Sequence, residues 1–251
     1  MKPTLCLIGG CNGAGKTTLA RELLPRMGIR RFLNADEIAR GLSPLDPSLS
    51  AFRAGRLLIS EAHGLLKSGS AFAIESTLSG VTHMALLRAA RESGFRVVLH
   101  YILLDSADQA VARVALRTTH GGHAVPEADV RRRFTRSRQH FLEDYLPLAD
   151  EWALWDNSNP PPVPVADHGN CTRQELAAML ESSKIQEPPT EEMPEIVRLG
   201  LEAGRAATAK MLDFYKRMGI RVTPQMTLAP EPKKRRTLNK KPASRGAEDR
   251  Q

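Results

Sequence analysis

The amino-acid sequence predicts an α/β fold with three layers, in which helices cover both faces of a mostly parallel central sheet. Two observations predict it. Short apolar runs with strand character alternate with longer stretches of helical period as far as about Asp156. The first apolar run ends in a glycine-rich loop that opens a helix. Such an alternation builds βαβ units with right-handed crossovers, whose ligands bind at the carboxyl ends of the strands.

The expected strands and helices follow one another from the N-terminus. Strands are expected at Thr4–Gly9, Arg31–Ala35, Ser70–Glu75, Arg96–Leu104 and Trp152–Trp155. Helices are expected at Lys16–Leu24, Ser48–Lys67, Val81–Ser93, Ala107–Thr118 and Glu127–Tyr145. The polar residues directly after each strand are therefore the first candidates for a functional site.

Proline-rich segments predict the boundaries of the domains. The run Ser158–Pro164 cannot continue a helix or a central strand, so a short strand and the helix Thr172–Lys184 are expected to complete a catalytic domain over residues 1–186. Glu187-Pro188-Pro189 predicts a linker into a helical appendage over residues 187–220. Residues 221–251 are basic and too poor in apolar side chains to offset the entropy of ordering, which predicts a disordered tail.

Charge and cysteine content exclude several classes of function. The net charge is +8, and the segment 231–251 alone carries eight basic and three acidic residues, which leaves +3 for the rest. This mild surplus suits phosphorylated ligands better than nucleic acid as the main partner. The three cysteines lack metal-ligand spacing and predict a reducing, cytoplasmic location. No segment approaches the roughly 20 apolar residues that span a bilayer, so no membrane association is expected.

The glycine-rich loop fits the Walker A pattern at every fixed position, which makes the expected fold a P-loop NTPase fold. Its sequence is Gly10-Cys11-Asn12-Gly13-Ala14-Gly15-Lys16-Thr17, and Thr18 follows. Backbone N–H groups of such a loop converge on phosphate at the positive end of a helix dipole. We expect Lys16 to reach the β- and γ-phosphates of ATP and the Thr17 hydroxyl to ligate Mg²⁺. Residues Gly10, Asn12, Gly13, Ala14, Gly15, Lys16, Thr17 and Thr18 form the predicted nucleotide site.

A Walker A loop does not identify the phosphate acceptor, so a second group of residues has to. Asp36 follows the run Phe32-Leu33-Asn34-Ala35, at the carboxyl edge of the strand expected next to the phosphate loop. A kinase holds its general base at such a place, against the acceptor hydroxyl. The alternative is that Asp36 caps the helix that begins there, a role that Asp often plays.

A second polar run, Glu75-Ser76-Thr77-Leu78-Ser79, also follows a strand. Glu75 can bind Mg²⁺ through water or contact an acceptor hydroxyl, and Thr77 can donate to the same ligand. The alternative is a polar turn that caps the next helix.

Seven arginines lie on the two expected helices that flank the glycine-containing hinge Thr118–Pro126. They are Arg113, Arg117, Arg131, Arg132, Arg133, Arg136 and Arg138. Two helices around such a hinge predict a lid, whose arginines neutralise charge on a transferred phosphoryl group. Most arginines on a helix are only solvated, so we expect two or three of the seven to be functional.

Several of these segments together resemble the zeta-toxin-like P-loop kinases, and especially the bacterial branch often labelled "predicted ABC-type ATPase". The resemblance covers about residues 4–160 and rests on segments 10–18, Leu33–Ala39, Ala73–Ser79, Gly121–Pro126 and Tyr145–Asp150. Kinases of this family transfer the γ-phosphate of ATP to a hydroxyl of UDP-N-acetylglucosamine and are restrained by an antitoxin.

The resemblance assigns roles to individual residues. It implies that Asp36 is the catalytic base, that Lys16 binds phosphate, and that Glu75 and Thr77 contact the acceptor. It matches Glu61 to a further acceptor contact, and it matches Arg117 and one of Arg131 to Arg133, represented by Arg132, to lid arginines. The chain departs from the family at Ser79, where zeta toxins usually carry arginine. UDP-N-acetylglucosamine is therefore the first acceptor to test, and another sugar nucleotide or a different small molecule stays open.

Other readings stay open beside the kinase. One is a P-loop ATPase whose hydrolysis drives a conformational change, although the chain lacks a Leu-Ser-Gly-Gly-Gln signature. Another is nucleic-acid binding through the basic tail. The apolar residues of Glu191–Met218 can pack on the kinase body, on an oligomer partner, or over the acceptor site as an inhibitor in cis.

Overall fold

The computed structural model describes residues 2–119 and 125–181 of the chain. The strands are β1 (Thr4–Gly10), β2 (Phe32–Leu33), β3 (Phe72–Ser76), β4 (Arg96–Leu103), β5 (Glu151–Asp156) and β6 (Val163–Asp167). The α-helices are α1 (Lys16–Arg26), α2 (Ala35–Leu42), α3 (Ala51–Lys67), α4 (Met84–Glu92), α5 (Ala107–Thr119), α6 (Glu127–His140) and α7 (Arg173–Glu181). The expected appendage at 187–220, the basic tail and the middle of the hinge lie outside the described residues.

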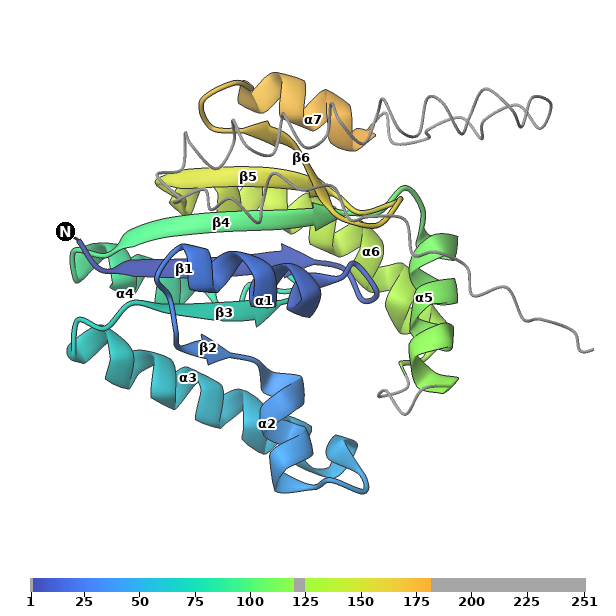
Figure 1. Ribbon diagram of the computed structural model, residues 1–251, viewed down its shortest axis with the longest axis horizontal. Helices are drawn as coiled ribbons and strands as arrows, with labels where there is room; N and C mark the ends of the chain where they lie inside the picture. Colours follow the sequence, from blue (N-terminus) through green and yellow to red (C-terminus); the bar gives the residue numbers. More distant parts are fainter. Residues whose placement is uncertain (1, 120–124, 182–251) are drawn as a thin grey trace, which may run out of the picture.

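The strands form one six-stranded sheet in the order β2-β3-β1-β4-β5-β6 (Figure 1). All neighbouring pairs are parallel except β5 and β6, which pair antiparallel. This confirms the α/β class with a mostly parallel sheet. The chain runs outward from β1 to β2, returns to β3, and then crosses to β4 on the other side of β1. The carboxyl end of β1 is therefore the switch point at which such sheets bind ligands.

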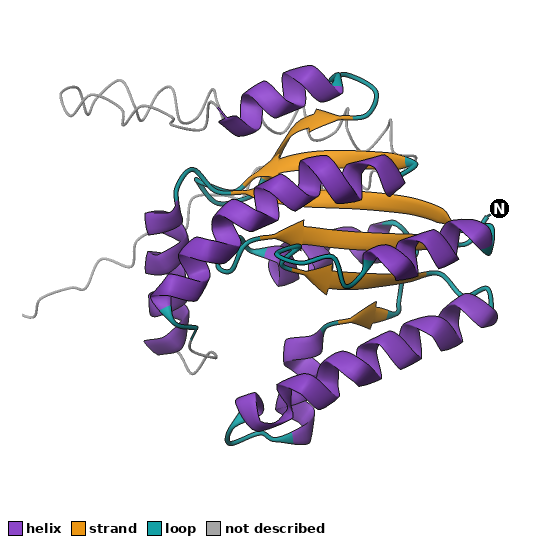
Figure 2. Ribbon diagram, turned by 180° about the vertical axis from the view of Figure 1, so that it is seen from behind, coloured by secondary structure: helices purple, strands orange, loops and turns teal. Residues whose placement is uncertain are grey.

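Alternating side chains of the strands build two separate hydrophobic cores. Leu5 and Leu7 of β1 point into the core that α3, α4 and α7 cover, together with the turn after α6. Cys6 and Ile8 point into the core that α1 and α5 cover. Figures 1 and 2 show α1 on one face of the sheet and α4 and α6 on the other. Strands buried on both faces explain why the apolar runs are continuous rather than alternating.

Several elements differ from their expected bounds, and in three of them the local structure changes. The second strand is only Phe32–Leu33, because Asn34 already ends it and begins α2. The helix expected at Ser48–Lys67 begins as a short 3-10 turn, η1 (Pro47–Ser50), which leads into α3. The helix expected to run to Tyr145 ends at His140 and continues as a π-helical turn, η2 (Phe141–Tyr145). A second 3-10 turn, η3 (Leu146–Leu148), leads from there into β5.

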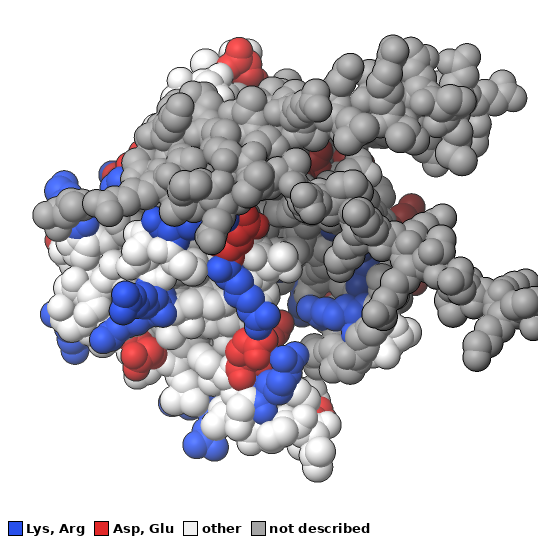
Figure 3. All heavy atoms as spheres, in the orientation of Figure 1, with Lys and Arg blue, Asp and Glu red and all other residues white. Residues whose placement is uncertain are grey.

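Basic and acidic side chains are interspersed over the described part of the face in Figure 3. That mixture is typical of a solvated surface and differs from the basic stripe of a nucleic-acid-binding face. Among residues 2–119 and 125–181, none of the helices combines the length and apolar content needed to cross a bilayer.

Candidate active site

The phosphate loop joins the buried strand β1 to helix α1 through three glycines with positive φ. Gly10, Gly13 and Gly15 have φ of 144°, 78° and 91°, in or near the left-handed region that other residues rarely adopt. A Cβ on Gly10 would lie 2.6 Å from the carbonyl oxygen of Ile102, so the strand β4 also excludes a side chain there. The loop backbone is therefore fixed in the open turn that a phosphate group requires.

Lys16 begins α1, and its ammonium group is held close to the loop. Its Nζ donates to the carbonyl oxygen of Cys11 at 2.9 Å and lies 3.9 Å from Oε1 of Glu75. The side chain is only 8% exposed. Cys11 itself is buried, and burial raises the pKa of its thiol, so it offers no reactive thiolate.

Asn157 also holds the phosphate loop, through a contact with its backbone. It follows β5, and its Nδ2 donates to the carbonyl oxygen of Ala14 at 2.8 Å. A Cβ on Gly15 would lie 2.4 Å from the same Nδ2, so Gly15 leaves the space that Asn157 fills. The sequence analysis did not identify Asn157, because nothing local marks a residue that bonds 143 positions away.

The side chain of Glu75, on β3, contacts residues of α1 and the residue that precedes α2. It lies near the end of β3, the strand beside β1, and its Oε2 accepts a hydrogen bond from Thr17 Oγ1 at 2.7 Å. Asn34 Nδ2 donates to the same oxygen at 2.9 Å. With Lys16 near its other oxygen, Glu75 is held on three sides and is only 11% exposed.

Thr17 and Glu75 fit a magnesium ion. Mg²⁺ prefers oxygen ligands and is usually bound by one or two carboxylates together with substrate phosphates. Because the Thr17 hydroxyl gives its proton to Glu75, the lone pairs of its oxygen remain for a cation at the mouth of the loop. These two side chains would hold the metal, which would neutralise charge on the phosphates.

Asp36 lies in the first turn of α2, and its surroundings correct two expectations. Its strand, β2, is not beside the phosphate-loop strand, because β3 separates the two. Asp36 also does not cap α2: Asn34 does, with its Oδ1 accepting from the backbone N–H groups of Asp36 and Glu37 at 2.8 and 3.3 Å. The Asp36 side chain is exposed toward the site and free of the capping role.

Asp36 and the phosphate loop nevertheless share one cavity of about 280 Å³. From the loop it is lined by Asn12, Gly13 and Lys16, and from the acceptor side by Asp36, Glu75 and Thr77. The sheet brings these residues together because β1, β2 and β3 all end at the same edge. Six of the twelve predicted nucleotide and acceptor residues thus face one space. Gly10, Ala14, Gly15 and Thr17 are not among its lining residues, and Thr18 is exposed on α1.

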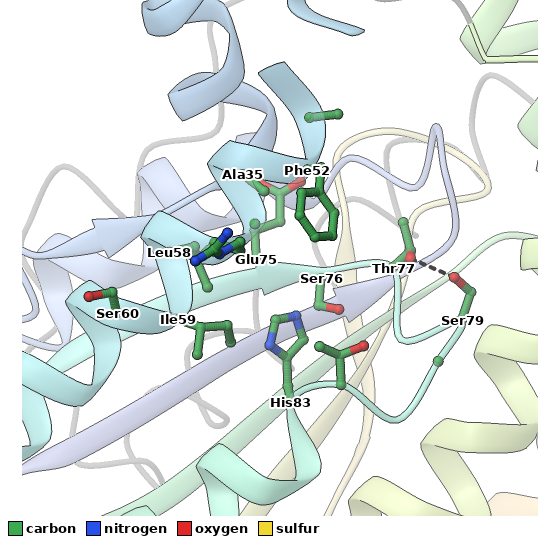
Figure 4. Close-up of a pocket in the computed structure, with 15 residues that line it drawn as sticks. Ala35, Phe52, Leu58, Ile59, Ser60, Glu75, Ser76, Thr77, Ser79 and His83 are labelled. Carbon is green, nitrogen blue, oxygen red and sulfur yellow. Dashed lines mark hydrogen bonds between the residues drawn. The ribbon is translucent and has the colours of Figure 1, made fainter. Parts of the chain in front are cut away.

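A larger cavity of about 760 Å³ opens beside the first and shares several of its walls. Helix α3 forms one wall, with Phe52, Arg56 and Ile59, and the segment after β3 forms the other. Figure 4 shows Thr77 and Ser79 at one end, joined by a hydrogen bond, and Ile59 and Ser60 toward the other. The size of this cavity suits a small molecule larger than a simple sugar.

The wall after β3 depends on an unusual backbone turn at Leu78. Its φ is 52°, which is rare for a residue other than glycine. Its side chain is fully buried against Gly9, where a Cβ would lie 2.4 Å from Leu78 Cδ1. Burying Leu78 in this way leaves Thr77 and Ser79 on the cavity side, with their hydroxyl oxygens 2.8 Å apart.

His83 completes that wall, and Tyr145 contacts the segment that forms it. His83 lines both cavities, and burial lowers the pKa of its imidazole, which favours the neutral form. Its Nδ1 is buried without a hydrogen-bond partner in the described structure. Tyr145 holds the turn that precedes His83, because the Tyr145 hydroxyl donates to the carbonyl oxygen of Gly80 at 2.6 Å. Neither residue was identified from the sequence.

Two of the seven arginines line the shared cavity, namely Arg117 and Arg133. Arg133 donates to Asn12 Oδ1 at 3.4 Å. Arg132, which the resemblance matched to a lid arginine, points elsewhere: it pairs with Asp129 at 2.9 Å, with its side chain 59% exposed. The structure therefore replaces Arg132 with Arg133 as the candidate.

The other arginines of the two helices have structural contacts or are exposed. Arg131 pairs with Asp108 and Glu127, Arg113 and Arg138 donate to backbone carbonyls, and Arg136 is exposed.

Glu61 also lies away from the site. It is exposed on α3 and is not among the residues that line either cavity, whereas Arg56 and Ser60 of the same helix line the larger one. The resemblance, which suggested Glu61, did not determine which face of α3 turns inward.

Fold and site together define a P-loop protein with a kinase-like arrangement of a phosphate loop and an adjoining small-molecule cavity. The chain belongs to the AAA domain family, whose family model matches residues 5–140, more than half of the chain. A relative from Haemophilus influenzae, an uncharacterized protein, is 34% identical over 125 residues, which are 50% of this chain and 88% of the relative.

Solved structures share the fold. The PezAT toxin-antitoxin system of Streptococcus pneumoniae aligns with a TM-score of 0.59 and 17% identity over 80% of this chain and 85% of that one. The AvrRxo1-ORF1:ORF2 complex with ATP aligns with a TM-score of 0.57 and 20% identity, over 79% and 70% of the two chains. A putative kinase from Chloroflexus aurantiacus aligns with a TM-score of 0.51 and 18% identity, over 73% and 99%.

Proposed function

We propose that the protein is an ATP-dependent small-molecule kinase that transfers the γ-phosphate to a hydroxyl group of an acceptor bound in the larger cavity. One observation carries the proposal: Asp36 lines the same cavity as Lys16 of the phosphate loop. A carboxylate close to where the γ-phosphate would lie is the arrangement that phosphoryl transfer to an alcohol needs.

The transfer can be written with these residues. Asp36 accepts the proton of the acceptor hydroxyl as its oxygen bonds to the γ-phosphorus, and the bond from that phosphorus to the bridging oxygen breaks to release ADP. Lys16, Arg117 and Arg133 line the cavity and stabilise the charge on the transferred group. Thr17 and Glu75 would hold Mg²⁺, which would supply further neutralisation of that charge.

The acceptor that we propose to test first is UDP-N-acetylglucosamine. Thr77, Ser79 and Ser76 offer hydroxyl groups to a sugar, and the cavity extends along α3 to Arg56, its only lysine or arginine among the described residues. Zeta toxins usually carry arginine where this chain has Ser79, so the cationic contact of this acceptor would come from α3 instead. A different sugar nucleotide is the natural second choice if that change alters specificity.

The test is transfer of the γ-phosphate to UDP-N-acetylglucosamine, followed by mass spectrometry of the sugar nucleotide. We expect phosphorylated product from the full chain and none from Lys16→Ala or Asp36→Asn. If ATP binds and no acceptor in a panel of sugar nucleotides is phosphorylated by the full chain or by residues 1–186 alone, the kinase proposal fails. ADP formed without any phosphorylated acceptor would support the alternative, a P-loop ATPase.

We also propose that activity is restrained by an antitoxin-like protein or by the residues after 186. The support is the fold shared with PezAT, which is described as a toxin-antitoxin system. Activity that rises at least tenfold when residues 187–251 are removed would favour restraint in cis. Equal activity of both forms would leave only a separate partner.

A further inference from the structure

Asn34 connects the two halves of the site, and no role was assigned to it by the sequence analysis. It lies between β2 and α2 and is 7% exposed. Both ends of its side-chain amide are used. Oδ1 accepts from the backbone N–H groups of Asp36 and Glu37, and Nδ2 donates to Glu75 Oε2 at 2.9 Å. One buried side chain therefore contacts both the turn that carries Asp36 and the carboxylate beside Thr17.

The chemistry of an amide suits this position. Only a side chain with an acceptor and a donor at its tip can satisfy backbone N–H groups on one side and a carboxylate on the other. Serine and aspartate cap helices about as well as asparagine, so the cap alone does not require an amide. The need for a donor comes from Glu75, because one of its carboxylate oxygens accepts hydrogen bonds from both Thr17 and Asn34.

We propose that Asn34 is a positioning residue that holds the metal-side carboxylate of Glu75 in fixed register with the base Asp36. The inference rests on the proposed kinase function for the role of Asp36. Thr17 and Glu75 locate the metal and the phosphates, while Asp36 locates the acceptor hydroxyl. Transfer requires both to be placed together, and errors of about 1 Å can cost on the order of 100-fold in rate.

Two substitutions separate the cap from the connection to Glu75. Asn34→Ser keeps a capping oxygen but is too short to reach Glu75, and Asn34→Ala removes both interactions. A matched control is Thr172→Ala. Thr172 precedes α7, exchanges hydrogen bonds with Glu175 in a capping box, and lies outside both cavities.

The first measurement is the Mg²⁺ concentration needed for half-maximal binding of a fluorescent ATP analogue, together with the unfolding temperature. We expect Asn34→Ser and Asn34→Ala to need about tenfold more Mg²⁺, as is typical when a group that orients a metal ligand is lost. Thr172→Ala should lower only the unfolding temperature. A wild-type Mg²⁺ dependence in Asn34→Ser would overturn the proposal and leave Asn34 as a helix cap.

The second measurement is kcat for transfer at saturating Mg²⁺. Asn34→Ser should lose part of kcat because Glu75 is no longer connected to the turn of Asp36, and Asn34→Ala, which also loses the cap, should lose at least tenfold. Equal kcat for Asn34→Ala and the wild type would overturn the connection to Asp36. If the wild type phosphorylates no acceptor, the proposed function fails, and the Mg²⁺ dependence of ATP binding then decides the role of Asn34 by itself.

Discussion

Asn157 provides the sharpest test of how the phosphate loop is held. Its Nδ2 donates to the carbonyl oxygen of Ala14 at 2.8 Å, and the side chain is 6% exposed. Asn157→Ala leaves that carbonyl buried without its partner, which costs about 1–3 kcal/mol. For a chain of this size, a loss of about 2 kcal/mol lowers the unfolding temperature by about 4–8 °C.

Asn157→Asp should be worse than Asn157→Ala, although it is nearly isosteric. It places a carboxylate oxygen where the amide donated, against the Ala14 carbonyl, and adds a buried negative charge beside the phosphate loop. We expect ATP affinity to fall about tenfold in Asn157→Ala, equivalent to about 1.4 kcal/mol, and further in Asn157→Asp.

Calorimetry and ATP titration measure both effects. Asn159→Ala is the control, because Asn159 is exposed in the same loop and should change stability by less than about 0.5 kcal/mol. If Asn157→Asp unfolds and binds ATP like the wild type, the hydrogen bond to Ala14 does not hold the loop, and the reasoning is refuted.

Three further predictions concern other parts of the structure. Arg133→Ala should lower kcat for transfer at least tenfold, whereas Arg132→Ala should not, and equal losses would contradict the assignment from the cavity. Tyr145→Phe removes the bond to Gly80 and should raise KM for the acceptor more than KM for ATP; burial raises the pKa of Tyr145 to about 12, so the wild type should show no such change up to pH 10. Burial lowers the pKa of His100 from 6.5 to about 3, so unfolding takes up a proton when the pH lies between these values. The free energy of unfolding should therefore decrease as the pH is lowered below 6.5, by up to about 1.4 kcal/mol per pH unit. Urea titrations of His100→Phe should show a smaller decrease.

Local features of the sequence predicted much of the fold and the nucleotide side of the site. The Walker A residues are contiguous, and their glycines together with the apolar strand before them indicate a phosphate loop without any contact from elsewhere in the chain. Glu75 and Asp36 were found because each follows an apolar run, and parallel strands end at one edge of the sheet.

What the sequence did not predict depends on contacts between distant segments. The position of β2 at the edge of the sheet is decided by pairing with β3, which no local pattern encodes. The choice of Arg133 over Arg132 depends on the rotation of α6, since neighbouring residues point about 100° apart on a helix. That rotation is fixed by packing, including the stacking of Phe141 on Tyr101 at 4.2 Å and the bond from Tyr101 to Ser137.

The turn at Leu78 could also not be foreseen. A positive φ at leucine is unfavourable by itself and is stable here because Gly9, on another strand, leaves room for its side chain. Sequence periodicity describes a residue within its own element, whereas the cavity wall depends on two residues from different elements.

The central claim is that Asp36 accepts a proton from an acceptor hydroxyl during transfer. The most direct measurement is kcat for acceptor-dependent ATP turnover in Asp36→Asn, compared with Glu37→Gln, which neutralises the neighbouring carboxylate that pairs with Arg40 outside the shared cavity. We predict that Asp36→Asn lowers kcat about 10²- to 10⁴-fold with ATP affinity unchanged, and that Glu37→Gln stays near wild type. Acceptor-dependent turnover in Asp36→Asn equal to that of the wild type would contradict the account.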